Sequence, residues 1–151
     1  MQQFWHNDIT DKSYTFLQTM QKNYNFVLIG GWAVYLYSRK MKSKDIDIVV
    51  SYEELGKLKS LYTLNKNERL HKYEINVGEF DIDIYLPHYS KIGFPLEKIN
   101  KYITHIEGFR VPQIEVLLGL KTFAYLDRKN SIKGEKDKID IISLIESVDL
   151  D

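Results

Sequence analysis

Two short segments of this 151-residue chain alternate aspartate with isoleucine, and this feature constrains the fold most strongly. The first reads KDIDIVV from Lys44, and the second reads FDIDIYLP from Phe80. A period of two is typical of a β-strand, because successive side chains point to opposite faces of the sheet. Each strand would bury its isoleucines and present its aspartates together. The sequence therefore predicts a sheet with one acidic face.

Helical and strand patterns follow one another along the rest of the chain. Segment 62–69 reads as a loop or a short strand, and segment 87–111 is the least regular part. The remaining patterns predict, in chain order, a helix over 11–23, a strand over 25–29, a helix over 32–39, a strand over 46–50, a helix over 51–61, strands over 72–77 and 80–86 joined at Gly78-Glu79, an edge strand over 109–111, a helix from 114 to about 126 and a last helix from 139.

A mixed sheet followed by helices indicates an α+β or α/β protein, and we expect the α+β arrangement. In that arrangement helices flank the sheet, and the C-terminal helices pack on it. The length fits one domain, with a sheet core over about 1–111 and a helical part over about 112–151. No internal repeat and no long linker divides the chain.

Composition excludes several classes of protein. No apolar run approaches the roughly 20 residues of a membrane-spanning helix, and the N-terminus lacks the basic-then-apolar pattern of a secretory leader. We therefore expect a cytoplasmic protein without a membrane partner, which the absence of cysteine fits. Lys plus Arg and Asp plus Glu both total 21, so no net positive field would attract nucleic acid. A site for a polyanion would have to be local.

Two runs of the chain are locally basic. One directly precedes the first acidic strand and contains Arg39, Lys40, Lys42 and Lys44. The other contains Lys129, Lys133, Lys136 and Lys138 and reads as a turn before the last helix. Taken alone, the second run is typical of a solvated face.

The paired aspartates point to a metal site. Asp45 and Asp47 share one face of their strand, as do Asp81 and Asp83, and carboxylates this close repel one another. Solvent, lysine, arginine or a divalent cation could offset that repulsion. One such strand alone is as well explained by a half-exposed sheet, but two in a chain this small favour cations. Mg²⁺ (or Mn²⁺) prefers one or two carboxylates together with phosphate oxygens and water, which implies a phosphorylated substrate.

The glycine pair Gly30-Gly31 ends one predicted strand and opens a helix. Free backbone N–H groups and the helix dipole at such a turn can receive phosphate. A glycine pair alone more often serves tight packing of a strand against a helix. Thirteen residues separate the pair from Asp45, and this spacing makes it informative, because the phosphate-binding turn and the acidic strand would then lie side by side.

The stretch GGWAVYLYSRKMKSKDIDIVV, together with the later FDIDIYLP, resembles the polymerase-beta-type nucleotidyltransferase superfamily. Trp32 after the glycines and Arg39 before the acidic strand are similar to the small antibiotic nucleotidyltransferases. The segment LLGLKTFAYLDRKNSIKGEKDKIDIISL is similar to the C-terminal motif of AbiEii-type toxin nucleotidyltransferases. Together these matches cover most of the chain except residues 87–111.

The resemblance implies a role for each matching residue. Gly30 and Gly31 would hold the triphosphate, and Asp45 and Asp47 would coordinate two magnesium ions. Asp81 or Asp83 would supply the third carboxylate, which binds metal and accepts the proton of the attacking group. The residues on the nucleotide side would be Arg39, Lys44, Lys121, Arg128, Lys136 and Asp137, with Asp140 a weaker candidate.

Two departures from the family patterns bear on these roles. Trp32 stands where many members of the superfamily carry Ser or Thr after the glycines, so backbone N–H groups would bind the phosphate alone. The chain is also shorter than typical AbiEii toxins, and we expect no separate acceptor-binding domain.

The predicted activity is metal-dependent transfer of a nucleoside monophosphate from ATP or another nucleoside triphosphate to a hydroxyl. RNA, a protein or a small molecule could provide that hydroxyl, and a second copy of the chain could complete the site. The alternatives are a non-catalytic nucleotide-binding module on the same fold and a partner in a toxin–antitoxin pair. Trp32 and Tyr85 are candidates to stack on a base. Among the histidines, His88 after the second acidic strand is the one to test.

Overall fold

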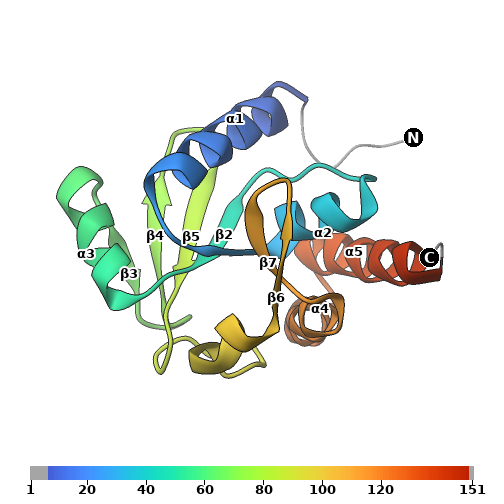
Figure 1. Cartoon of the computed structure of the whole chain (residues 1–151). Coiled ribbons are helices and arrows are strands. Elements are labelled where there is room, and N and C mark those ends of the chain that lie inside the picture. The colour runs from blue at the N-terminus through green and yellow to red at the C-terminus, as the bar shows by residue number, and fades with distance from the viewer. Residues whose placement is uncertain (1–6, 150–151) are drawn as a thin grey trace.

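The computed structural model describes residues 7–149 of the chain and contains the expected mixed sheet with helices around it (Figure 1). The α+β class is therefore confirmed. The elements are α1 (Asn7–Asn23), β1 (Val27–Ile29), α2 (Gly30–Ser38), β2 (Ile46–Val49), α3 (Tyr52–Leu61), β3 (Asn65–Asn67), β4 (Lys72–Asn76), β5 (Asp81–Tyr85), the 3₁₀ helix η1 (Leu96–Tyr102), β6 (Ile103–Ile106), β7 (Phe109–Pro112), α4 (Ile114–Arg128) and α5 (Ile132–Asp149).

The described residues bear on only part of the expectation that the chain has no membrane-spanning segment and no secretory leader. Within residues 7–149, none of the helices combines the length and the apolar character that a membrane crossing requires. The start of the segment on which the leader expectation rests, residues 1–6, lies outside the described residues.

The five-stranded sheet has the order β1-β2-β5-β4-β3, so the two acidic strands are neighbours. β2 and β5 run parallel, with Asp47 opposite Asp83 and Ile48 opposite Ile84, whereas the other strand pairs are antiparallel. Because the two Asp-Ile-Asp segments are aligned in register, their aspartates lie on the same face of the sheet. A separate hairpin of β6 and β7 lies against β1.

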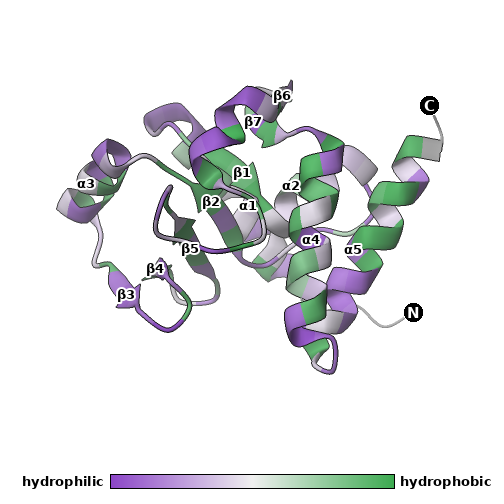
Figure 2. Ribbon diagram, turned by 90° about the horizontal axis from the view of Figure 1, so that it is seen from below, coloured by the Kyte–Doolittle hydropathy of each residue, from purple (hydrophilic) through white to green (hydrophobic). Residues whose placement is uncertain are grey.

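Each face of the sheet has its own apolar core. The face with Ile48 and Ile84 packs against side chains of α1, α2 and α3, such as Leu17 and Leu58. The opposite face carries the aspartates, and beside them Val27, Ile29 and Val49 form a smaller core with residues of η1 and α4. Figure 2 shows the hydrophobic stretches of β1 and β2 at the centre of the molecule. The alternation in the sequence thus separates a fully apolar face from one that is apolar only at one end.

The last helix begins at Ile132, so the expected basic turn up to Lys138 is wrong. The Ser131 hydroxyl accepts a hydrogen bond from the Gly134 N–H at 3.1 Å and caps this helix. The side chain of Lys136 is buried among acidic partners, so part of the basic run faces the interior and not solvent. Helix α1 likewise begins at Asn7, earlier than expected.

Candidate active site

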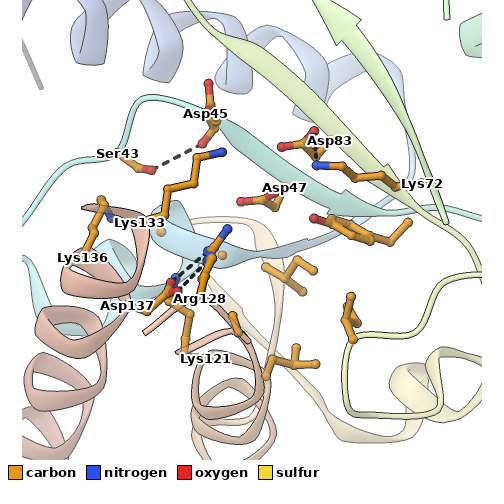
Figure 3. Close-up of a pocket in the computed structure, with 17 residues that line it drawn as sticks. Ser43, Asp45, Asp47, Lys72, Asp83, Lys121, Arg128, Lys133, Lys136 and Asp137 are labelled. Carbon is orange, nitrogen blue, oxygen red and sulfur yellow. Dashed lines mark hydrogen bonds and ion pairs between the residues drawn. The ribbon is translucent and has the colours of Figure 1, made fainter. Parts of the chain in front are cut away.

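A pocket lies between the acidic face of the sheet and the two C-terminal helices (Figure 3). Strand residues supply one wall, whereas α4 and α5 supply the other. Its charged lining consists of Asp45, Asp47, Asp83 and Asp137 and of Lys72, Lys121, Arg128, Lys133 and Lys136. The pocket therefore places carboxylates on the sheet opposite a group of cations on the helices.

The carboxylates from β2 and β5 meet because of the strand register. Asp47 and Asp83 are paired across the parallel strands, and Asp45 stands two residues before Asp47 on the same face. All three line the pocket beside the glycine turn. The predicted convergence of acidic side chains from two strands next to Gly30-Gly31 is therefore present in the structure.

Asp81 has a different place from Asp83. Its carboxylate accepts a hydrogen bond from the Asn76 side chain at 3.0 Å, and it does not line the pocket. Its backbone N–H donates to the Asp45 carboxylate at 2.8 Å, which fixes the orientation of Asp45. Of the two residues that the sequence left open for the third carboxylate, the structure brings Asp83 into the pocket.

Burial makes the ionised carboxylates costly in the absence of a ligand. Burial raises the pKa of Asp47, and Asp45 raises it further, while Lys121 and Lys72 offset part of this rise. Burial together with repulsion from Asp47 raises the pKa of Asp83 to about 7. Groups with shifted pKa values that share a pocket are typical of functional sites.

Lys72 on β4 partners the third carboxylate. Its Nζ donates to Asp83 Oδ1 at 3.0 Å, and both side chains are largely buried. Burial alone would lower the pKa of Lys72, but Asp83 and Asp47 raise it above its ordinary value. The sequence analysis did not single out Lys72, because only the pairing of β4 with β5 brings it beside Asp83.

The glycine turn touches both sides of the pocket. Gly30 has a φ of +71°, and a Cβ built there would lie 2.2 Å from Asp47 Oδ2. A Cβ on Gly31 would lie 2.5 Å from Ser43 Oγ and 2.9 Å from Lys136 Nζ. Both positions therefore require glycine, because any other side chain would displace an acidic or basic group of the pocket.

Helix α2 starts at this turn without a side-chain cap. Ile29 occupies the N-cap position and makes no capping hydrogen bond. The first N–H groups of a helix lack partners within the helix, and the dipole favours an anion there. The start of α2 can therefore receive phosphate oxygens.

A network of ion pairs joins α4 to α5 at the rim of the pocket. The Asp137 carboxylate accepts hydrogen bonds from Lys121 Nζ at 2.9 Å and from Arg128 Nε at 2.7 Å. Asp140 pairs with Lys121 at 2.9 Å and with Lys136 at 3.2 Å. The predicted residues Lys121, Arg128, Lys136 and Asp137 thus line the pocket together, and Asp140 supports them from behind.

Three residues that the sequence placed near the nucleotide, Arg39, Trp32 and Lys44, lie outside the pocket. Arg39 pairs with Glu107 at 2.9 Å in a second groove between α1, α2 and the β6–β7 hairpin. Trp32 is 1% exposed and donates to Ser13, so it cannot stack on a base in the pocket. Lys44 and the exposed His88 do not line the pocket either. Tyr85, the other candidate for stacking, does line it.

Two further lining residues were not predicted as site residues. Ser43 lies beside Gly31, and its hydroxyl donates to the backbone carbonyl of Asp45 at 3.4 Å. Lys133 extends from the first turn of α5 toward the Asp45 side of the pocket (Figure 3). Lys133 belongs to the basic run that is typical of a solvated face, and only the earlier start of α5 places it here.

The donor set suits a cation that keeps outside ligands. Within residues 7–149, no three acidic or histidine side chains are grouped closely enough to hold a metal by themselves. Asp45 and Asp47 are the pair without a lysine bonded to either carboxylate among the hydrogen bonds described, whereas Asp83 is held by Lys72. Magnesium sites with one or two carboxylates are completed by phosphate and water, and this pair fits that chemistry.

Solved structures with a similar fold include nucleotidyltransferases and a nucleotidyltransferase-like protein. ANT(2")-Ia in complex with adenylyl-2"-tobramycin matches with a TM-score of 0.61 at 16% identity, over 95% of this chain and 90% of that one. A nucleotidyltransferase candidate from Thermotoga maritima matches with a TM-score of 0.57 at 16% identity, over 89% and 99%. An antigenic nucleotidyltransferase-like protein from Paracoccidioides brasiliensis matches with a TM-score of 0.53 at 19% identity, over 93% and 77%.

Sequence comparison adds no relative to these structures. A scan against protein-family models finds no match, and no curated protein matches the sequence. The likeness is therefore one of three-dimensional structure. At that level the expected resemblance to nucleotidyltransferases is confirmed, and the chain has the fold of these structures.

Proposed function

We propose that this chain is a metal-dependent nucleotidyltransferase that moves a nucleoside monophosphate from a nucleoside triphosphate to a hydroxyl of an acceptor. One observation carries the proposal. Asp45, Asp47 and Asp83 meet beside the Gly30-Gly31 turn, with the basic residues of α4 and α5 across the pocket. A site with this charge distribution suits a phosphate chain that is bound through cations on one side and held by lysine and arginine on the other.

Asp45 and Asp47 would hold Mg²⁺ or Mn²⁺, with Asp83 as the third carboxylate. When bound, the cations would offset the repulsion among the carboxylates and polarise the α-phosphate of the donor. Asp81 acts at one remove, because its backbone N–H orients the Asp45 carboxylate. The protein's own contribution is then the placement of these oxygens by two adjacent strands.

The triphosphate would lie along the glycine turn toward the helices. The uncapped N–H groups at the start of α2 would donate to its oxygens, and Ser43 and Lys136, whose side chains lie next to Gly31, would flank the phosphates there. Lys121, Arg128 and Lys133 would neutralise the charge that develops on the leaving pyrophosphate.

Asp83 would act as the general base of the transfer. The acceptor hydroxyl gives its proton to Asp83, its oxygen forms a new bond to the α-phosphorus, and the bond between the α- and β-phosphates breaks. Pyrophosphate leaves in line with the attack. Lys72 holds Asp83 in place through Oδ1, which leaves the other carboxylate oxygen for the proton.

The acceptor would approach over the polar side of β3, β4 and β5. In-line attack requires it to come from the side away from the pyrophosphate, hence from the Asp83 side and not from the α4–α5 side. The sheet face next to Asp83 carries Glu74 and Asn76 on β4 and Asn65 and Asn67 on β3. The principal contacts of α4 and α5 are with each other, α2 and β7, so this part of the face stays accessible.

A transfer assay with labelled nucleoside triphosphate, Mg²⁺ and candidate acceptors tests the proposal. Asp45→Asn and Asp47→Asn should abolish transfer and keep the fold, as measured by circular dichroism. Asp81→Asn is the matched control, because it lies on the same sheet face outside the pocket and keeps its backbone N–H. Normal transfer by either of the first two variants refutes the mechanism. Calorimetric binding of nucleotide without any product, over the same panel, would instead identify a non-catalytic nucleotide-binding module.

A further inference from the structure

Part of the pocket wall is apolar and is not explained by phosphate or metal binding. Beside the carboxylates, the lining includes Ile29, Tyr85, Ile92, Leu120 and Ala124. These residues come from β1, β5, the segment after β5, and α4. Exposing this apolar wall to water costs free energy, and a ligand with one apolar and one charged part would cover it while it binds the charged residues.

This apolar wall is the open edge of the smaller core. Ile29 and Leu120 belong to that core and are 4% and 6% exposed, and Tyr85 and Ile92 pack against it. The surrounding residues are therefore close-packed and hold the wall in shape. A surface of this kind is preorganised for a ligand and does not need to form on binding.

The position of Ile92 is fixed from the side of α4. A Cβ built on the next residue, Gly93, would lie 2.6 Å from Phe123 Cγ, so the segment after β5 is pressed onto α4 at this point. Ala124 follows Phe123 in the helix and contributes only a methyl group to the lining. Ile92 and Ala124 therefore both border the apolar part of the pocket, which we call the slot.

Hydrogen-bonding side chains of the lining are already engaged at the charged end. Lys121 and Arg128 pair with Asp137, Lys72 pairs with Asp83, and Ser43 lies at the glycine turn. On the apolar wall, Tyr85 is the polar exception within the described lining, and its hydroxyl interacts with Asp47. The wall thus offers contact area and few side-chain groups that could read the edge of a base.

We propose that this slot receives the nucleobase of the donor and selects it by shape, so that the four nucleoside triphosphates are used with similar efficiency. This inference rests on the proposed function and specifies its donor. Apolar sites discriminate between similar ligands by roughly 10- to 200-fold, whereas sites that hydrogen-bond a ligand group reject analogues lacking it by about 10⁴-fold or more. The larger purine ring covers more of the wall, so purines should lead pyrimidines by roughly tenfold at most.

The test is kcat/KM for ATP, GTP, CTP and UTP with Mg²⁺ and one acceptor. Values within about 100-fold of one another support shape selection. Use of one nucleotide about 1,000-fold better than all others overturns it while leaving the proposed transfer intact. If no nucleotide supports transfer, the proposed function fails. Calorimetric dissociation constants of the four nucleotides then test the inference about the slot on their own. Dissociation constants within about 100-fold support the inference, and one dominant nucleotide or no binding by any of the four overturns it.

Two variants locate the base. Ala124→Phe fills the slot and should raise KM for all four nucleotides by roughly tenfold or more, whereas Ile92→Ala removes one side and should do the same without adding bulk. Inorganic tripolyphosphate, which has no base, should bind both variants as it binds the wild type, and this shows that the phosphate site has folded. Leu126→Phe is the matched control, because Leu126 lies on the same helix and is 63% exposed. Unchanged nucleotide KM in both slot variants would overturn the inference.

Discussion

The pair of Asp83 and Lys72 sets the charge of the site before any ligand binds. Lys72 offsets only part of the cost of placing Asp83 beside Asp47 in a buried position, and the pKa of Asp83 remains near 7. The Asp83 carboxyl group is therefore mostly ionised only above about pH 7, and its charge is unfavourable for the folded chain alone. The ionised form that the proposed reaction requires therefore lowers the stability of the folded chain.

Asp83→Asn should stabilise the ligand-free protein at pH 8 by up to about 4 kcal/mol and have little effect near pH 4. The pKa of Asp83 in the folded chain, about 7, lies above the ordinary value of about 3.9. Folding therefore favours the protonated form, and the stability of the wild type falls as the pH rises from about 4 through 7. Asparagine imitates the protonated group at every pH. Urea unfolding at the two pH values measures the difference.

Asp81→Asn provides the control for this measurement. Its carboxylate bonds to Asn76 outside the pocket, so its effect on unfolding should be small and similar at both pH values. A loss of stability on Asp83→Asn at pH 8 would contradict the prediction and would mean that the Lys72 ion pair stabilises the fold.

Lys72→Met should lower kcat for transfer by roughly 10- to 100-fold and leave KM for the nucleotide nearly unchanged. Lys72 holds Asp83, which the acceptor meets, and lies on the opposite side of the pocket from the proposed pyrophosphate site. Lys72→Arg should recover part of kcat, because a guanidinium can make the same pair. Lys66→Met on the neighbouring strand is the control, since Lys66 lies over the Tyr89 ring. An equal rise in KM would place Lys72 at the nucleotide instead.

At the scale of residues, the sequence predicts what depends on periodicity and misses what depends on register. Asp45 and Asp47 share a face because they are two apart, which can be read directly from the chain. The choice between Asp81 and Asp83 depends on how β5 sits beside β2, and the role of Lys72 depends on how β4 sits beside β5. No local pattern encodes either alignment.

Among the elements, the hairpin of α4 and α5 supplies most of the basic residues of the pocket, and a network of buried ion pairs holds them in place. Asp137 is 1% exposed and serves two cations, Lys121 and Arg128. Burial alone would raise the pKa of Asp137, but the two cations lower it below its ordinary value. This carboxylate holds both cations at the pocket, and its loss would leave Arg128 without this partner and Lys121 with Asp140 alone.

Asp137→Asn should therefore destabilise the protein by about 1–3 kcal/mol at pH 7, because Lys121 keeps its pair with Asp140. Because the pKa of Asp137 is lowered in the folded chain, its contribution is present above the ordinary value near 4 and is lost as the pH falls through the folded value. The gap between variant and wild type should accordingly narrow below pH 4. Thermal or urea unfolding at pH 7 and pH 3 measures it.

The exposed Asp127 on the neighbouring helix α4 supplies the comparison for Asp137 on α5. Asp127→Asn should change the free energy of unfolding by less than about 0.5 kcal/mol at either pH. An equally small effect of Asp137→Asn at pH 7 would show that the ion-pair network positions the cations but does not stabilise the fold.

The start of α5 in the same hairpin is an element boundary that the sequence does not predict correctly. The charged run from Arg128 to Lys138 lacks the apolar period that marks a helix, so the sequence favours a turn. In the structure its charges pair with one another, as Arg128 does with Asp137 and Lys136 with Asp140, and these pairs replace apolar contacts on the buried side of α5. The period of the strands, in contrast, survives because isoleucine alternates with aspartate without interruption.

For the molecule as a whole, the site exists only when segments distant in the sequence are assembled. The glycine turn, the two acidic strands and the α4–α5 hairpin meet through the sheet order and through packing of α5 on α2. The sequence predicts each part and the fold class. In the irregular segment 87–111 it predicts the strand at 109–111, which is β7, but neither η1 nor the pairing of β7 with β6 beside β1. Tertiary contacts without a local period account for that gap.

Assembly from separate segments makes ligand binding a measure of the whole fold. A nucleoside triphosphate with Mg²⁺ would join the acidic sheet face to the basic helices and relieve repulsion within both, so it should bind the folded chain and not the unfolded one. At 100 times its dissociation constant, such a ligand adds about 2.7 kcal/mol. For a chain of about 150 residues this raises Tm by roughly 5–10 °C.

Scanning calorimetry with nucleotide and Mg²⁺, with nucleotide and EDTA, and with Mg²⁺ alone separates the contributions of the nucleotide and of the cation to this rise in Tm. The combined ligand should give the largest shift, and Asp45→Asn and Asp47→Asn should remove most of it. An equal shift in EDTA would mean that the helices hold the nucleotide without the carboxylates, and the acidic strands would then have to serve another purpose.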